Sequence, residues 1–240
     1  MAAPTATTRR VGRASTPILV CGDPHRARGT VLLYHGLGVS KETNLPELRK
    51  LAEAGLVAVG VDAVGHGERR YEDYAERFPA SGSEQSARSF YQVVEQSVAE
   101  LPAVIDGLID AGITDGRHLG IAGISMGGYI TFGAPLVERR LAAAAVLIGS
   151  PFWRLCGDRS PHLHPERFAP LPLLIVTAEK DSKVPPHHAR DFHRRLLPYY
   201  DMVPGRLCYE ELTGAEHIMG DADWRRATAA MVEWLARHLV

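Results

Sequence analysis

Short apolar runs recur along the chain from residue 30 onward, and the stretches between them space their apolar residues along one face of a helix. The runs are continuously apolar rather than alternating with polar residues, a pattern typical of parallel strands that are covered on both faces. They predict buried strands at 30–34, 56–61, 118–122, 143–148 and 173–176. A further run at 206–212 is more polar, so we expect it nearer an edge of the sheet.

Amphipathic stretches predict helices in the intervals between these runs. They cover 45–54, 86–111, 126–140 and 186–197. The clearest predicted helix lies nearer the C-terminus, after these four. One of its faces is formed by Trp224, Ala227, Thr228, Met231, Leu235 and His238. Pro102 is expected to kink or split the second helix, because proline lacks a backbone N–H and crowds the preceding turn.

Repeated strand-helix-strand units predict the α/β class, with a mainly parallel, twisted sheet flanked by helices. No internal repeat, low-complexity tract or block long enough for a large cap domain interrupts the pattern, so residues 1–240 are expected to form a single domain. Residues 1–15 are basic but are not followed by an apolar stretch. We expect them to be a flexible tail that leads into a first strand, not a signal peptide or a membrane anchor.

The charge balance and the cysteines indicate which binding partners and which cellular compartment to expect. The 27 Lys and Arg residues nearly balance 28 Asp and Glu, and no segment concentrates one sign, so neither nucleic acid nor a membrane is an expected partner. Cys21, Cys156 and Cys208 are odd in number and widely spaced. They fit reduced thiols in a cytoplasmic protein, and one disulfide with a spare thiol is the alternative. The oligomeric state stays open.

Two long stretches, 65–83 and 149–170, fit neither a strand nor a helix. Both follow the carboxyl end of a predicted strand, the edge at which open α/β sheets bind ligands. We expect them to form pocket walls or a lid, the alternative being plain surface loops. Their large apolar side chains are Tyr71, Tyr74 and Phe78 in the first and Phe152, Trp153, Leu155 and Phe168 in the second. These are expected to close a compact pocket, unless they pack onto the core and leave an open cleft.

The segment GISMGG, 123–128, places Ser125 between glycines directly after an apolar run. A strand-to-helix turn of this kind pushes a serine out over the edge of the sheet, and the pattern G-x-S-x-G is that of a nucleophile elbow. The alternative is that Ser125 caps the following helix. A pattern with three fixed positions also occurs by chance, so the partners of the serine decide between the two.

Attack by a serine on an acyl carbon needs a base, an acid that orients the base, and N–H donors for the oxyanion. Asp181 follows the fifth apolar run and His217 follows the more polar sixth, while the glycine-bearing loop 35–38 follows the first. The chain order Ser, Asp, His is that of an α/β-hydrolase. Glu179 lies in the same loop as Asp181 and is the alternative acid.

Residues 28–240 resemble the α/β-hydrolase superfamily, nearest its small serine esterases and dienelactone-hydrolase-like members. The resemblance rests on VLLYHGLG, VDAVGHGER, GISMGG, and the pair EKDSKVPP and GAEH. It implies that the backbone N–H groups of Leu37 and Met126 form the oxyanion hole. Two departures are visible: Ala178 begins the acid loop where these families commonly have glycine, and Ser125 stands where dienelactone hydrolases proper have cysteine. The substrate of the latter is therefore not carried over.

Other candidate groups favour structural roles. His35 is expected to support the oxyanion loop, His66 to occupy a turn near the pocket, and Asp62 to cap a turn at a strand end. Two histidine pairs, His162 with His164 and His187 with His188, lack a third ligand at a recognisable spacing. GISMGG lacks the lysine of a phosphate-binding loop, and no acidic ribose ligand follows. Neither a metal nor a cofactor is expected.

These observations predict a cytoplasmic, carboxylesterase-like serine hydrolase that cleaves a carboxylic ester or thioester of a small acyl group through an acyl-enzyme. Ser125 attacks, His217 takes and returns the proton, and Asp181 holds the imidazole. A compact pocket would favour acyl chains of about two to six carbons, because methylenes that do not fit strain the walls. The alternatives are an acyltransferase or short-peptide hydrolase with the same triad, or a non-catalytic ligand-binding protein of this fold.

Overall fold

A computed structural model describes residues 4–79 and 82–239. Its eight-stranded sheet has the order β1-β2-β4-β3-β5-β6-β7-β8 within this described part. The strands are β1 (Ala6–Val11), β2 (Thr16–Cys21), β3 (Thr30–Tyr34), β4 (Val57–Val61), β5 (Leu119–Ile124), β6 (Leu141–Leu147), β7 (Leu173–Ala178) and β8 (Leu207–Leu212). β3 to β8 run parallel, whereas β1 and β2 are antiparallel to their neighbours. The predicted α/β class is confirmed.

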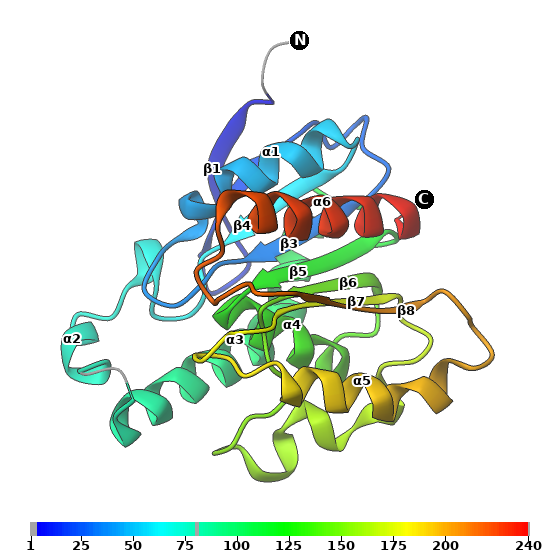
Figure 1. The fold of residues 1–240 in the computed structure, drawn as a ribbon. Coiled ribbons are helices and arrows are strands. Elements are labelled where there is room, and N and C mark those ends of the chain that lie inside the picture. The colour runs from blue at the N-terminus through cyan, green and yellow to red at the C-terminus, as the bar shows by residue number, and fades with distance from the viewer. Residues whose placement is uncertain (1–3, 80–81, 240) are drawn as a thin grey trace.

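Helices cover both faces of the sheet, as Figure 1 shows. They are α1 (Leu45–Glu53), α2 (Tyr74–Arg77), α3 (Glu84–Asp110), α4 (Met126–Val137), α5 (His187–Tyr200) and α6 (Asp221–His238). α1 and α6 cover one face, and their Leu48 and Leu235 belong to one apolar cluster. α3, α4 and α5 cover the other face, where Phe132 and Phe192 belong to a second cluster.

The parallel strands are buried because each of them packs against both helical layers. In β3, Leu32 and Tyr34 point into the cluster beneath α4, whereas Val31 and Leu33 point into the cluster beneath α6. All four side chains are fully buried. This double burial is the reason for the continuously apolar sequence of the strand, because adjacent residues of a strand face opposite sides.

The expected flexible tail at residues 1–15 is wrong for Ala6–Val11, which form β1 and pair antiparallel with β2. The pattern of apolar residues does not predict β1, because β1 is an edge strand whose residues 7–10 are all exposed and polar. Backbone hydrogen bonds to β2, rather than apolar burial, hold most of the strand. Residues 1–3 of the expected tail lie outside the described residues.

Pro102 does not split α3, which continues from Glu84 to Asp110. Its neighbours Leu101 and Ile105 are fully buried against the sheet. Burying one such side chain contributes roughly 1.5–3 kcal/mol, whereas one missing backbone hydrogen bond costs only about 1 kcal/mol. Tertiary packing therefore outweighs the proline.

The described parts of the two long excursions contain short helical turns. The first contains α2 and the turn Gly67–Arg69, and its residues 80 and 81 lie outside the described chain. In the second, Trp153 and Phe168 are almost completely buried in the cluster beneath α5, where the Phe168 ring lies 5.0 Å from that of Phe192. These aromatic side chains pack onto the core, as in the open-cleft alternative.

Candidate active site

Ser125 occupies the sharp turn between β5 and α4 and has φ +54° and ψ −112°, a conformation that L residues rarely adopt. Its N–H donates to the carbonyl of Leu147 at 2.9 Å. A Cβ at Gly123 would lie 2.0 Å from the Gly127 oxygen, and a Cβ at Gly127 would lie 2.1 Å from the Tyr34 oxygen. Both glycines are therefore required for α4 to approach the strands this closely.

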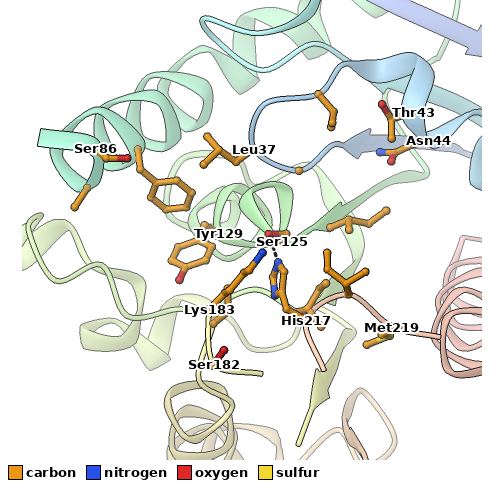
Figure 2. Close-up of a pocket in the computed structure, with 18 of the residues that line it drawn as sticks. Leu37, Thr43, Asn44, Ser86, Ser125, Tyr129, Ser182, Lys183, His217 and Met219 are labelled. Carbon is orange, nitrogen blue, oxygen red and sulfur yellow. Dashed lines mark hydrogen bonds between the residues drawn. The ribbon is translucent and has the colours of Figure 1, made fainter. Parts of the chain in front are cut away.

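The side chain of Ser125 makes no helix-capping hydrogen bond, so the capping alternative is wrong. Its Oγ lies 3.0 Å from Nε2 of His217, as the dashed line in Figure 2 marks. Nδ1 of His217 lies 2.6 Å from Oδ2 of Asp181. The structure thus brings together three residues that are 36 or more positions apart in the sequence.

Asp181 is buried and held by the backbone of its own loop. Its Oδ1 accepts the N–H groups of Lys183 at 2.9 Å and Val184 at 2.7 Å, which leaves Oδ2 for the imidazole. Glu179, the alternative acid, instead accepts the N–H of Gly214 at 2.6 Å. Glu179 therefore supports the loop that precedes His217 and makes no hydrogen bond to its ring.

The loop after β3 runs beside the serine, and a Cβ at Gly36 would lie 3.8 Å from that of Ser125. The buried ring of His35 donates from Nδ1 to the Gly36 carbonyl at 2.8 Å and accepts the N–H of Ala63 at Nε2 at 3.1 Å. Burial lowers the pKa of His35, which keeps the ring neutral in this tautomer. In a trans peptide the Leu37 N–H points opposite to the Gly36 carbonyl, so His35 orients it away from the ring.

A cleft of about 970 Å³ lies over Ser125. Its walls come from the start of α3, the segments 36–47 and 217–224, and the loop 182–184. None of the seven large side chains that the sequence assigns to a compact pocket lines it. Among their described residues, the two excursions contribute only Gly82, Ser83 and Arg154. That expectation is wrong because large aromatic rings are stabilised more by the core than by an exposed rim.

A model of the family described as "Serine aminopeptidase, S33" matches residues 25–159, more than half of the chain. The chain belongs to this family of the α/β-hydrolase superfamily. It is a serine hydrolase by family.

Several relatives of this S33-family chain match it over nearly its whole length. "Putative esterase YitV" of Bacillus subtilis (strain 168) is 29% identical over 90% of this chain and 91% of its own. The crystal structure of TT1662 from Thermus thermophilus has a TM-score of 0.78 with 25% identity, covering 96% of this chain and 98% of its own. Dienelactone hydrolase from Anabaena variabilis has a TM-score of 0.67 with 17% identity over 99% and 98%, which shows the shared fold.

A buried ionic network joins the loops on one side of the serine. Lys41, whose side chain is fully buried, contacts Asp62 at 2.9 Å, Glu68 at 2.6 Å and Glu42 at 2.8 Å. Burial lowers the pKa of Lys41, but its hydrogen bonds to the three carboxylates outweigh burial and raise it. Asp62 thus ties Lys41, in the segment after β3, to the segment after β4 and does not line the cleft. The network was not expected, because no local pattern identifies a lysine as buried.

His66 is also buried away from the cleft, with Nδ1 3.0 Å from the Val64 carbonyl. Burial lowers its pKa to about 4. The histidines His162 and His188 both lie against the ring of Phe152, at 5.0 and 4.5 Å. Among residues 4–79 and 82–239, no group of three His, Cys, Asp or Glu side chains is placed to hold a metal. Cys21, Cys156 and Cys208 are free thiols.

None of the helices in the described ranges combines the length and the apolar character that a membrane crossing requires.

Proposed function

We propose that the protein cleaves a carboxylic ester or thioester through an acyl-enzyme on Ser125. One observation carries the proposal: Ser125, His217 and Asp181 form a continuous chain of hydrogen bonds at the base of the cleft. A nucleophile, its base and the acid that orients the base are the parts that acyl transfer needs. The chain's likeness to a relative named as an esterase over nine-tenths of its length supports the ester as the substrate class.

In the first half-reaction, Oγ of Ser125 attacks the carbonyl carbon while Nε2 of His217 takes the hydroxyl proton. The bond to the alcohol or thiol then breaks, and His217 gives its proton to that leaving group. In the second half-reaction, water attacks the acyl-enzyme by the same route and releases the acid. Asp181 keeps the Nδ1 proton of His217 facing it and stabilises the imidazolium.

The oxyanion that forms at the carbonyl oxygen is placed next to the backbone N–H groups of Met126 and Leu37. Met126 begins α4 directly after the serine, so its N–H adds the favourable dipole of a helix N-terminus. Leu37 lines the cleft, and His35 orients its peptide. Removing one such donor in comparable sites costs roughly 3 kcal/mol of transition-state stabilisation.

The proposal sets no upper limit of six carbons on the acyl group. The sequence-based restriction to small acyl groups rests on large apolar walls, but none of those side chains lines the cleft, and Trp153 and Phe168 lie in the core. A second candidate is cleavage of a short peptide, which the family's name, serine aminopeptidase, favours. Transfer of the acyl group to an alcohol is distinguished from hydrolysis by analysing products in the presence of a competing alcohol.

The test is covalent labelling with a fluorophosphonate probe, followed by peptide mass mapping. We expect one label on Ser125, loss of labelling in Ser125→Ala, and full labelling in Ser182→Ala, which changes another serine that lines the same cleft. Parallel assays compare p-nitrophenyl esters with aminoacyl p-nitroanilides. Faster anilide cleavage would favour the peptidase, and absence of both labelling and ester cleavage would reject the proposed function.

A further inference from the structure

Lys183 lines the cleft, and Figure 2 shows its ammonium pointing toward the pair formed by Ser125 and His217. Its backbone N–H is bound to Oδ1 of Asp181 at 2.9 Å, so the base of the side chain is fixed relative to the acid that holds His217. Within the described chain, no carboxylate lies within ion-pair distance of this ammonium. The amine is therefore a free cation beside the position that an ester must occupy.

Arg154 is a second cation that lines the same cleft. It also forms no ion pair with any described residue. It lies next to Tyr91: burial raises the pKa of that phenol, and Arg154 lowers it in part. The Tyr91 ring is 6.3 Å from that of Tyr129. Figure 2 places Tyr129 and Lys183 on the side of Ser125 that is away from Asn44.

Glu47 is the one carboxylate among the described residues that line the cleft. It lies near Asn44 in α1, is buried, and accepts the indole N–H of Trp224 at 3.0 Å. Neither cation is therefore neutralised by the wall of the cleft. The cleft therefore presents two cations that none of its described lining carboxylates neutralises, whereas the overall charge of the chain is close to zero.

We propose that the substrate carries a carboxylate close to its scissile ester or thioester bond, and that Lys183 binds it with support from Arg154. The inference rests on the proposed function and names the substrate class more closely. An unpaired ammonium beside His217 opposes the imidazolium that forms during acyl transfer, because like charges repel. A carboxylate on the substrate removes that repulsion, because it neutralises the charge of the ammonium.

The test is the ratio of kcat/KM for a charged ester to that of a neutral ester of the same length. One pair is mono-p-nitrophenyl adipate and p-nitrophenyl hexanoate, which differ in the terminal carboxylate. The second pair places the charge on the alcohol, as the acetyl ester of a hydroxybenzoate against that of a hydroxybenzamide. The ratio is used because it cancels any general effect of a variant on folding or on the nucleophile.

For the wild type we expect a kcat/KM ratio well above one in at least one pair. That ratio should fall about tenfold in Lys183→Met and recover in Lys183→Arg. High salt should also lower it, because the cation is exposed to solvent. Lys180→Met is the matched control, an exposed lysine of the same loop that does not line the cleft. An unchanged ratio in Lys183→Met, including an equal loss on both esters of a pair, overturns the inference. Absence of both Ser125 labelling and ester cleavage would instead reject the proposed function.

Discussion

Asp181 and Glu179 lie two residues apart in the loop after β7, yet their carboxylates bind opposite ends of the segment 214–217. Oδ2 of Asp181 is 2.6 Å from the ring of His217, and Oε2 of Glu179 is 2.6 Å from the backbone nitrogen of Gly214. One carboxylate therefore orients the ring, and the other anchors the turn that leads to it. The two roles predict different kinetic consequences for the same type of substitution.

Asp181→Asn is expected to lower kcat by roughly 10³–10⁴, because an amide presents a donor to Nδ1 and favours the wrong imidazole tautomer. Glu179→Gln is expected to lower kcat less than about tenfold, since an amide oxygen still accepts the Gly214 N–H. Steady-state rates on an activated ester measure both. If Glu179→Gln is the more damaging of the two, the assignment of the acid is wrong.

Ser125→Gly is expected to be inactive and yet more stable than Ser125→Ala, by about 1 kcal/mol. Alanine keeps the Cβ that strains the backbone at φ +54°, whereas glycine adopts this conformation freely. Urea unfolding of the two variants measures the difference. Ser182 is the control, because it is not among the residues with positive φ. Ser182→Gly should be no more stable than Ser182→Ala.

The stability of the protein is expected to fall as the pH is lowered from about 6.5 toward 4. His66 binds a proton in the unfolded chain near pH 6.5, but burial lowers its pKa to about 4 in the fold. The unfolded state therefore binds more protons in this window, and stability is fully present above it. From these two values, His66 contributes a loss of about 2 kcal/mol between pH 7 and pH 5.

Unfolding free energies at pH 7 and pH 5 test this for the wild type and for His66→Asn, in which the loss should shrink. His35, whose pKa burial also lowers, leaves part of the dependence in place. His25→Asn changes an exposed histidine and should leave the dependence unchanged. An equal loss in His66→Asn and wild type would contradict the role of His66.

Cleavage of p-nitrophenyl esters is expected not to decline beyond six acyl carbons. The cleft is lined by apolar side chains such as Phe90 and Ile218, and each buried methylene contributes up to about 0.8 kcal/mol. kcat/KM measured from acetate to octanoate checks this. Phe90→Ala should flatten the rise, whereas Phe78→Ala should not, because Phe78 does not line the cleft. A maximum at short chains would instead support a compact pocket.

Much of the fold follows from the sequence because its signals are local. Val31, Leu32 and Leu33 are adjacent and all buried, and such a run is typical of a strand covered on both faces. Ser125, Asp181 and His217 were predicted as partners for a related reason. Each follows a different strand of one parallel sheet, and the carboxyl ends of parallel strands meet at one edge.

What the sequence alone determined, then, is where most of the buried strands lie along the chain and the edge at which the serine, the acid and the histidine meet. Tertiary structure alone decided which side chains form the cleft. Trp153 and Phe168 lie in the core, while Lys183 points at the serine and Lys41 is buried among carboxylates. The physical reason is that burial and ion pairing depend on contacts between residues distant in the chain, and no local periodicity records those contacts.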